Sequence, residues 1–325
     1  MRHFCTYFDR NYLPRGLALY HSLIRHCPEF HLYVLAMDEM TRVALEGLRP
    51  ANLTVISLAE LEAANPHLAL IRASRSSVEY YYTCGPSWLL HLLKSQQQID
   101  LLIYLDADLF FFSDPAPLFD EMETYSIALV EHRLSAKLRP DLSRYGRYNV
   151  GWVAFRRDQQ GLECLQWWAA SCLEWCYDRV EDDRFADQKY LEAFPDRFSR
   201  VCILQHKGAN LAPWNISNYR ITVHDDGVWV DDVPLLFFHF HGFKVIAPWL
   251  FDSNLGWYRT LLSGSVRRHI FLPYIEALRC SQSQAGLGAS IRESSRGFGS
   301  LTTALRSAFR ISLGLVSRSY IVNFR

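Results

Sequence analysis

The sequence predicts an α/β fold in which a mostly parallel central sheet is flanked by helices. Strand-like and helix-like segments alternate through the first half of the chain, which is typical of strand–helix–strand units. Near-continuous apolar runs, such as LLIYL at residues 101–105, fit strands that are buried on both faces. The chain has 325 residues, half of them hydrophobic, which suffices for one large domain with such a core.

Predicted strands and helices follow one another closely in the first half. The strands cover residues 4–8, 31–37, 53–58 and 100–112, and the helices cover residues 13–25, 41–48, 59–64 and 76–93. In open sheets of this kind, ligands bind beyond the carboxyl ends of the strands. Residues that directly follow a predicted strand are therefore the first candidates for a functional site.

The second half departs from this alternation. Its predicted elements are a strand at residues 148–155, helices at 161–180 and 183–193, and short strands at 219–224 and 228–233. The two short strands flank Asp225-Asp226-Gly227, which favours a β-hairpin turn.

The composition argues against some classes of partner. Lys plus Arg number 34 and Asp plus Glu number 34, so no net field attracts nucleic acid, and we expect no nucleic-acid partner. The eight cysteines are irregularly spaced and form no CxxC pair, which is typical of reduced thiols in an intracellular protein. The sequence begins without an apolar signal-peptide core, and no stretch has 18 uninterrupted apolar residues. These features predict a cytoplasmic protein.

The most informative motif is YLDADLFFFSDP, in which Asp106 and Asp108 follow a buried apolar strand. Two carboxylates at such a position are unfavourable unless a cation compensates them. A divalent cation such as Mg²⁺ binds one or two carboxylates and fills its remaining positions with water and phosphate oxygens. We therefore expect Asp106 and Asp108 to bind a divalent cation; a solvated pair of acids is the alternative.

Around this motif the sequence resembles the GT-A fold glycosyltransferases, particularly family 8 and related bacterial nucleotide-diphospho-sugar transferases. In those enzymes the DxD follows a strand that reads like LLYLDADxxxxxDP, which residues 102–115 match closely. The family's later motifs occur here in the same order, as Asn149-Val150-Gly151, Asp187-Gln188 and His239-Phe240-His241-Gly242. The resemblance covers roughly residues 1–250 and implies a GT-A-like nucleotide-binding fold.

The resemblance implies Mn²⁺ or Mg²⁺ as the cofactor and assigns three ligands to it. Asp106 and Asp108 would bind the metal, and Asp106 would also lie close to the ribose or sugar of the donor. His239, three residues before Gly242, matches the family's third metal ligand. Alternation along a strand points His241 to the same face, so His241 remains an alternative ligand.

The resemblance also places residues around a nucleotide-sugar donor. Asn149 and Gly151 would lie under the donor sugar. Asp187 and Gln188, on a predicted helix, would lie near the anomeric carbon and are the catalytic candidates. Lys244, one position closer to the histidine motif than the family's lysine, would contact the diphosphate. Candidate contacts to the nucleotide, each of which could instead cap or pack, are Thr6, Tyr7, Asp9, Asp38 and Arg75.

The resemblance implies transfer of a sugar from a nucleoside diphosphate sugar, with a UDP-sugar as the expected donor, to a hydroxyl group. The expected acceptor is a glycan in bacterial surface-polysaccharide synthesis, and the expected reaction retains the anomeric configuration. A nucleotidyltransferase is one alternative, but the stretch after Phe8 contains only Gly16 and lacks the Gly-rich, Arg-containing loop of those enzymes. A haloacid-dehalogenase-type phosphatase would carry its DxD after the first strand, whereas here it follows about the fourth. A non-catalytic nucleotide-sugar-binding protein of the same fold is the third alternative.

These patterns divide the chain into segments. We expect a GT-A-like catalytic domain over residues 1–250, a helical extension over 251–280, a linker over 281–300 and a basic amphipathic tail over 301–325. In the tail, apolar residues recur at helical spacing beside four arginines, and no acidic residue follows Glu293. This favours a helix resting on the inner face of an anionic membrane, which would suit a lipid-linked glycan acceptor. Packing on the protein itself or on a partner subunit is the alternative.

Overall fold

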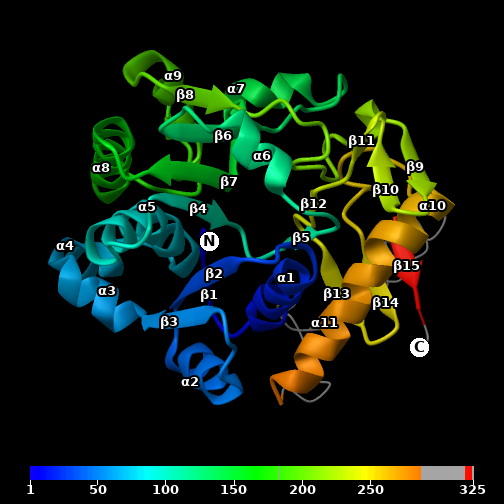
Figure 1. The fold of residues 1–325 in the computed structure, drawn as a ribbon, viewed down its shortest axis with the longest axis horizontal. Coiled ribbons are helices and arrows are strands. Elements are labelled where there is room, and N and C mark those ends of the chain that lie inside the picture. Colours follow the sequence, from blue (N-terminus) through cyan, green and yellow to red (C-terminus); the bar gives the residue numbers. More distant parts are fainter. Residues whose placement is uncertain (182, 287–318, 324–325) are drawn as a thin grey trace, which may run out of the picture.

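A seven-stranded sheet runs through the centre of the computed structural model, which describes residues 1–181, 183–286 and 319–323 (Figure 1). In spatial order its strands are β3 (Leu53–Ser57), β2 (Phe30–Ala36), β1 (Arg2–Phe8), β4 (Leu101–Leu105), β7 (Tyr148–Arg156), β6 (Ile127–Glu131) and β8 (Val201–Ile203). The pairs β1–β2, β2–β3, β1–β4 and β6–β8 are parallel, whereas β7 is antiparallel to both β4 and β6. The predicted α/β fold with a mostly parallel sheet is therefore confirmed.

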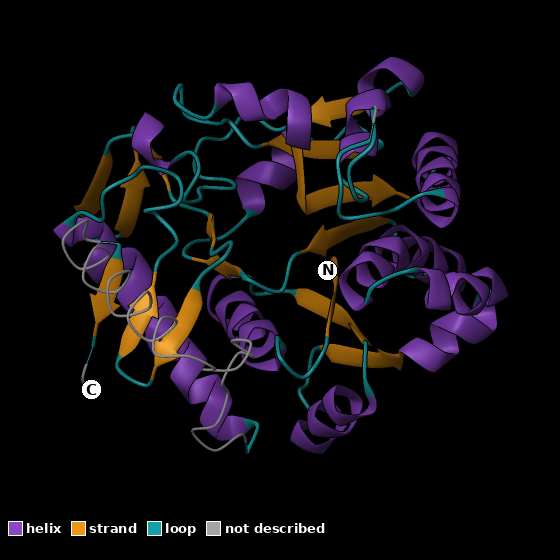
Figure 2. Cartoon of the chain, turned by 180° about the vertical axis from the view of Figure 1, so that it is seen from behind, coloured by secondary structure: helices purple, strands orange, loops and turns teal. Residues whose placement is uncertain are grey.

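Helices cover both faces of this sheet because each strand alternates its side chains between two cores. On β4, Leu102 and Tyr104 belong to one core, and Ile103 and Leu105 belong to the other. The first core is covered by α3 (Leu58–Ala64), α4 (Pro66–Ile71), α5 (Ser77–Ser95) and α8 (Gln159–Glu174). The second is covered by α1 (Leu13–His26), α2 (Glu39–Leu48) and α6 (Ala116–Glu121). Figures 1 and 2 show α5 and α8 packed side by side, away from α1.

The long strand predicted over residues 100–112 is in fact two strands. It consists of β4 and β5 (Leu109–Phe111), and the segment between them is a turn in which the Leu109 N–H donates to the Asp106 carbonyl at 3.1 Å. The turn redirects the chain away from the central sheet, so β5 pairs with a different strand. Asp106 and Asp108 therefore follow the buried strand β4, as predicted, and lie on the turn before β5.

Two helices predicted in the second half differ from the structure. The helix predicted over residues 161–180 ends at Glu174, because Trp175 has an extended backbone. The helix predicted over residues 183–193 is wrong: Ala186 has a left-handed backbone with φ 48°, and only the short 3₁₀ helix η3 (Lys189–Ala193) follows. Asp187 and Gln188 therefore precede a helix rather than lying on one.

A second layer follows the central sheet. The antiparallel partner of β5 is β12 (Phe237–His239), and the predicted hairpin forms as β9 (Ile221–His224) and β10 (Gly227–Val230), with β11 (Val233–Pro234) beside it. Strands β13 (Lys244–Ala247) and β14 (Leu250–Asp252) come before most of the helical extension predicted over residues 251–280. Its helices follow as α10 (Gly264–Val266), the π-helix η5 (Arg267–Phe271) and α11 (Leu272–Gln284). Phe240 stacks on Tyr274 of α11 with ring centroids 3.7 Å apart, which ties this helix to the end of β12.

The C-terminal tail differs from its prediction where it can be described. Residues 287–318 and 324–325, which include most of the predicted linker and amphipathic helix, lie outside the described residues. Residues Tyr320–Val322 form strand β15, which pairs antiparallel with β14, and Ile321 is fully buried. This part of the tail is therefore a strand of the fold. Within the described ranges, none of the helices combines the length and hydropathy that crossing a membrane requires.

Candidate functional site

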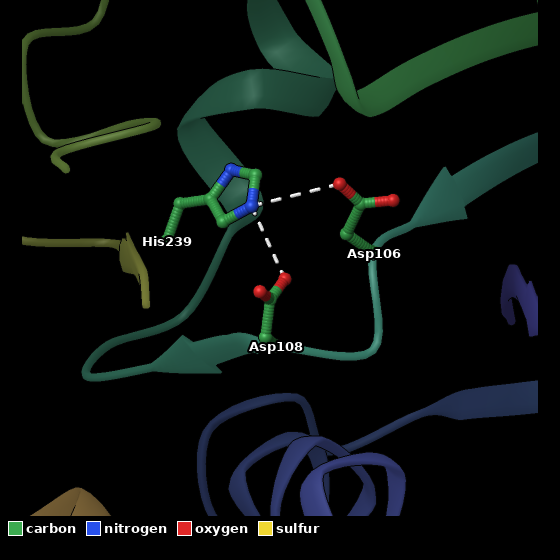
Figure 3. Close-up of side chains that lie close together, drawn as sticks. All are labelled: Asp106, Asp108 and His239. Atoms are coloured by element: carbon green, nitrogen blue, oxygen red, sulfur yellow. Dashed lines mark ion pairs between the residues drawn. The ribbon is translucent and has the colours of Figure 1, made fainter. Parts of the chain in front are cut away.

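Three side chains converge where β4 ends. Asp106 begins the turn after β4, Asp108 directly precedes β5, and His239 is the last residue of β12. In the β5–β12 pair His239 lies opposite Leu109, and the Phe240 N–H donates to the Asp108 carbonyl at 3.0 Å. This pairing brings His239 next to the two carboxylates, as Figure 3 shows.

The geometry of this Asp–Asp–His cluster fits a divalent cation. His239 Nε2 lies 3.1 Å from Asp108 Oδ1 and 3.5 Å from Asp106 Oδ2, and one ligand atom of each residue lies within 4.8 Å of the others. Nε2 is buried and has no hydrogen-bond acceptor of good geometry among the described residues, while the Asp106 side chain is 32% exposed. The cluster thus offers an imidazole nitrogen and carboxylate oxygens from a site that solvent can reach. Both are ligand types that divalent metals accept.

Electrostatics hold the cluster together without a metal. Burial raises the pKa of Asp106, the charge of His239 opposes this, and the neighbouring Asp108 adds to it. Burial also acts to raise the pKa of Asp108, but the charge of His239, 3.1 Å away, holds it at about 2. Burial acts to lower the pKa of His239, yet Asp108 and Asp106 raise it overall. The opposite shifts of the pKa values of His239 and Asp108 thus share one cause, the attraction between these two side chains.

Side chains around the cluster fix its orientation. Asn149 on β7 faces the imidazole, with its Oδ1 3.2 Å from His239 Nδ1. A proton on Nδ1 donated to this oxygen leaves Nε2 free to act as a ligand. The Tyr104 hydroxyl donates to Asp106 Oδ1 at 2.7 Å, and the Asp106 N–H donates to the Gly151 carbonyl at 2.9 Å. A Cβ added at Gly151 would lie 2.7 Å from both Asn149 Oδ1 and His239 Cε1, so this position has room only for glycine.

Asp187 and Gln188 lie beside the cluster despite the absence of the predicted helix. Gln188 Oε1 accepts a hydrogen bond from Asn149 Nδ2 at 3.2 Å, which links Gln188 to His239 through one side chain. Asp187 is only 4% exposed, and burial together with the nearby Asp106 raises its pKa to about 8. Asp187 is therefore largely a neutral acid at pH 7 and can donate a hydrogen bond.

The alternative ligand His241 lies outside the cluster. Its ring contacts Trp214 at 5.4 Å and Tyr258 at 6.3 Å between centroids, and His241 is exposed, whereas His239 is buried. The strand ends at His239, so strict alternation does not extend to residue 241. The structure therefore favours His239 over His241.

The residues predicted to border the nucleotide differ in their burial and in their hydrogen-bond partners. Tyr7 stacks on Tyr104 at 5.5 Å, and the charges of Asp187 and Asp106 add to burial in raising its pKa, so it lies near the cluster. Thr6 is fully buried in β1. Asp9 accepts the backbone N–H groups of residues 11 and 12, and Asp38 caps α2 through the Thr41 N–H at 2.7 Å. Both acids follow parallel strands, and both already accept hydrogen bonds from backbone N–H groups.

The contacts of two further candidates, Arg75 and Lys244, are with residues outside the cluster. The Arg75 guanidinium stacks over Tyr177 at 3.9 Å and donates to the carbonyls of Leu173 and Glu174, so it holds the end of α8. Lys244 is exposed and lies opposite Asp252 in the β13–β14 pair. The structure thus does not bring either cation to the three ligand side chains.

Sequence reasoning missed two buried residues near the cluster. His132 follows β6, its Nε2 lies 3.4 Å from Asn149 Nδ2, and burial lowers its pKa to about 4. Arg15 is buried on α1, donates to the Phe243 carbonyl at 2.8 Å, and its charge helps to lower the pKa of Asp108. Neither residue stands out in the sequence: Glu131 separates His132 from the apolar run before it, and Arg15 sits in an ordinary amphipathic helix.

Two proteins of Bacillus subtilis (strain 168) align with most of the chain. The uncharacterized protein YfnD is 34% identical over 279 residues, which cover 85% of this chain and 88% of YfnD. The uncharacterized protein YfnF is 31% identical over 251 residues, which cover 75% of this chain and 82% of YfnF. No family model matches the chain.

Solved glycosyltransferase structures share the fold at low sequence identity. The galactosyltransferase LgtC in complex with donor and acceptor sugar analogs superposes with a TM-score of 0.51 at 18% identity, over 87% of this chain and 95% of LgtC. An active-site mutant of LgtC gives a TM-score of 0.53 at 17% identity, over 86% and 95% of the two chains. The chain therefore belongs to the family of YfnD and YfnF, and its fold is that of the GT-A glycosyltransferases.

Proposed function

We propose that the protein is a metal-dependent glycosyltransferase. It transfers a sugar from a nucleoside diphosphate sugar, with a UDP-sugar as the expected donor, to a hydroxyl group of an acceptor. The observation that carries this proposal is the cluster of Asp106, Asp108 and His239 at the carboxyl end of β4 in a GT-A fold. Ligands of open α/β sheets bind at this edge, so the cation-binding groups lie where a nucleotide would be held.

The cluster would hold the cation whose positive charge assists sugar transfer. A bound Mn²⁺ or Mg²⁺ stabilises negative charge on the departing diphosphate. Asp106, Asp108 and His239 would hold the cation, Asn149 orients the imidazole, and the Tyr104 hydroxyl orients the Asp106 carboxylate. The roles of Asn149 and Tyr104 require no movement of the backbone, because their hydrogen bonds are already formed.

We assign Asp187 and Gln188 to the donor sugar. Asp187 is buried with its pKa raised to about 8, so it can donate a hydrogen bond to a sugar hydroxyl at neutral pH. The Gln188 side chain is held between Asn149 and the Tyr145 carbonyl, to which its Nε2 donates at 2.9 Å. This arrangement connects the sugar-binding groups to the metal ligands through hydrogen bonds.

A panel of nucleotide sugars tests the proposal and separates it from its alternatives. The full chain is incubated with each donor and Mn²⁺, Mg²⁺ or EDTA, and release of nucleoside diphosphate is measured. Metal-dependent release supports a glycosyltransferase. Release of pyrophosphate from a nucleoside triphosphate and a sugar phosphate would identify a nucleotidyltransferase, and binding of donors without any turnover would identify a non-catalytic protein.

We further propose a glycan acceptor in bacterial surface-polysaccharide synthesis and retention of the anomeric configuration. Support comes from the resemblance to family 8 and from the fold shared with LgtC, which was crystallised with donor and acceptor sugar analogs. NMR of the freshly released sugar decides the stereochemistry, because the first product anomer is either that of the donor or its opposite.

We also propose a cytoplasmic location and, separately, contact of the basic tail with an anionic membrane. Arg306, Arg310 and Arg318 are the cations that would carry it. We expect the wild-type chain to co-sediment with anionic vesicles in a salt-dependent way and the triple Arg→Glu variant to remain in solution, since each Arg near such a surface contributes about 1 kcal/mol. Equal recovery of both chains would leave packing on protein as the role of the tail. Truncation at Gln284 is a poor test, because it also removes β15.

A further inference from the structure

A pocket of about 470 Å³ is lined mainly by the segment that connects β6 to β7. Its lining includes Arg133, Arg139, Arg147, Ser143, Glu131 and Glu192. Most of these residues belong to the segment between β6 and β7, residues 132–147, which contains the short helices η2 (Arg139–Asp141) and α7 (Leu142–Tyr145). The volume is that of a site for a small ligand, and the metal and donor contacts proposed above do not use its arginines.

The segment that lines this pocket is cationic although the whole chain is neutral. Residues 132–147 contain five Lys and Arg residues and one acidic residue, Asp141, while the chain as a whole has 34 of each sign. Such a concentration of one sign of charge creates a local field that attracts anions. The five cations are Arg133, Lys137, Arg139, Arg144 and Arg147.

The acids that line the pocket are already engaged. Glu131 forms an ion pair with Arg147, and Glu192 Oε1 accepts the Arg147 backbone N–H at 2.9 Å. Arg133 donates to the carbonyls of residues 206 and 209, but its Nε is buried and has no hydrogen-bond partner among the described residues. Arg139 is exposed and makes no ion pair with any described acid. Arg139 therefore keeps its donors for an anionic ligand.

The pocket segment is attached to the metal cluster on two sides. On one side, Leu134 and Leu138 pack with Trp214, whose ring centroid lies 5.0 Å from that of His239. On the other, the carbonyl of Tyr145 accepts from Gln188 Nε2 at 2.9 Å, and that of Ser143 accepts from Lys189 Nζ at 2.9 Å. The segment that lines the pocket is thus connected to Gln188, one of the two residues assigned to the donor sugar.

We infer that this pocket binds an acidic saccharide, a sugar that carries a carboxylate or phosphate group, as the acceptor of the transfer. The inference rests on the proposed function and adds the chemical class of the acceptor. A guanidinium pairs with a carboxylate or phosphate through two parallel hydrogen bonds. A neutral sugar offers Arg139 no anionic group for such a pair.

Ligand binding to the full chain, measured by NMR titration without donor, tests the inference. The probes are methyl β-glucuronide, glucose 6-phosphate and the neutral methyl β-glucoside. We expect either acidic probe to bind at least about 10-fold more tightly than the glucoside, and R139Q to abolish this preference. Arg144 provides the matched control, since it is exposed on the same segment, stacks on Tyr145 at 5.0 Å and does not line the pocket. R144Q should change affinity less than about 2-fold.

Three results would overturn the inference. Equal binding of the glucuronide and the glucoside would show that charge is not recognised. If R139Q and R144Q weakened the binding of an acidic probe equally, the preference would come from the overall positive charge of residues 132–147 and not from the pocket. A slower acceptor-free hydrolysis of the nucleotide sugar by R139Q would assign the pocket to the donor. Because binding is read without turnover, a wild-type chain that hydrolyses no nucleotide sugar refutes the proposed function separately.

Discussion

His239 is the side chain most dependent on its surroundings. Its ring is buried, with Nδ1 facing an amide oxygen and Nε2 facing two carboxylates. Burial alone would lower its pKa, so the raised pKa shows that the carboxylates of Asp108 and Asp106 outweigh desolvation. A cation that binds at Nε2 must therefore displace a proton.

Metal binding should release a proton from His239. Calorimetric titration of Mn²⁺ in buffers of different ionisation enthalpy should show this release, and the apparent affinity should rise with pH up to the raised pKa of His239 and level off above it. H239A should lose the release and most of the affinity, whereas H241A should keep both. Unchanged proton release in H239A would mean that another group carries the proton.

The buried acid Asp187 should make stability fall as pH rises. Its pKa is about 8 in the fold and about 4 in the unfolded chain, so between these values the folded state binds more protons than the unfolded state. The free energy of unfolding of the metal-free protein should therefore decrease from pH 4 to pH 8. D187N, which cannot ionise, should gain about 1–3 kcal/mol over wild type at pH 8 and nothing at pH 4. A difference independent of pH, in denaturant titrations, would contradict the raised pKa.

At the scale of elements, the site depends on pairings that the sequence pattern does not show. The strands and helices of the first half could be predicted, because apolar runs and helical periodicity are local features. The β5–β12 pair joins residues well over a hundred positions apart, and no local pattern indicates it. The family motifs indicated His239, whereas the turn at Asp106 and the left-handed Ala186 depend on tertiary packing. The positions of Arg15 and His132 likewise follow from long-range contacts alone.

Gly151 shows how closely β7 approaches the cluster. G151A should shift Asn149 or His239, since its Cβ would lie 2.7 Å from atoms of both. We expect a loss of about 1–3 kcal/mol in stability and about 10-fold or more in Mn²⁺ affinity. The control is G47A on α2, where a Cβ meets nothing within 4 Å; it should add up to about 1 kcal/mol of stability and leave metal affinity unchanged. Equal metal affinity of G151A and wild type would contradict the described packing.

At the scale of the whole molecule, the second layer completes the site. Strand β12, which carries His239, is not part of the central sheet and pairs only with β5 among the described strands. Phe240 and Phe243, which follow it, pack against Tyr274 of α11. The chain then returns as β15 beside β14, so residues near the C-terminus contribute to the same core as β12. Metal binding and the integrity of the C-terminal layer are therefore expected to be coupled.

The central claim, that the Asp–Asp–His cluster holds a catalytic cation, is tested most directly by the rate of nucleoside diphosphate release from the best nucleotide sugar. Wild type, D108N and the control D232N, which removes an exposed carboxylate paired with Lys207, are compared with Mn²⁺ and with EDTA. We predict that D108N loses about 100-fold or more in rate, that D232N matches wild type, and that EDTA abolishes release by both active chains. Near-wild-type release by D108N, or by wild type in EDTA, would contradict the claim.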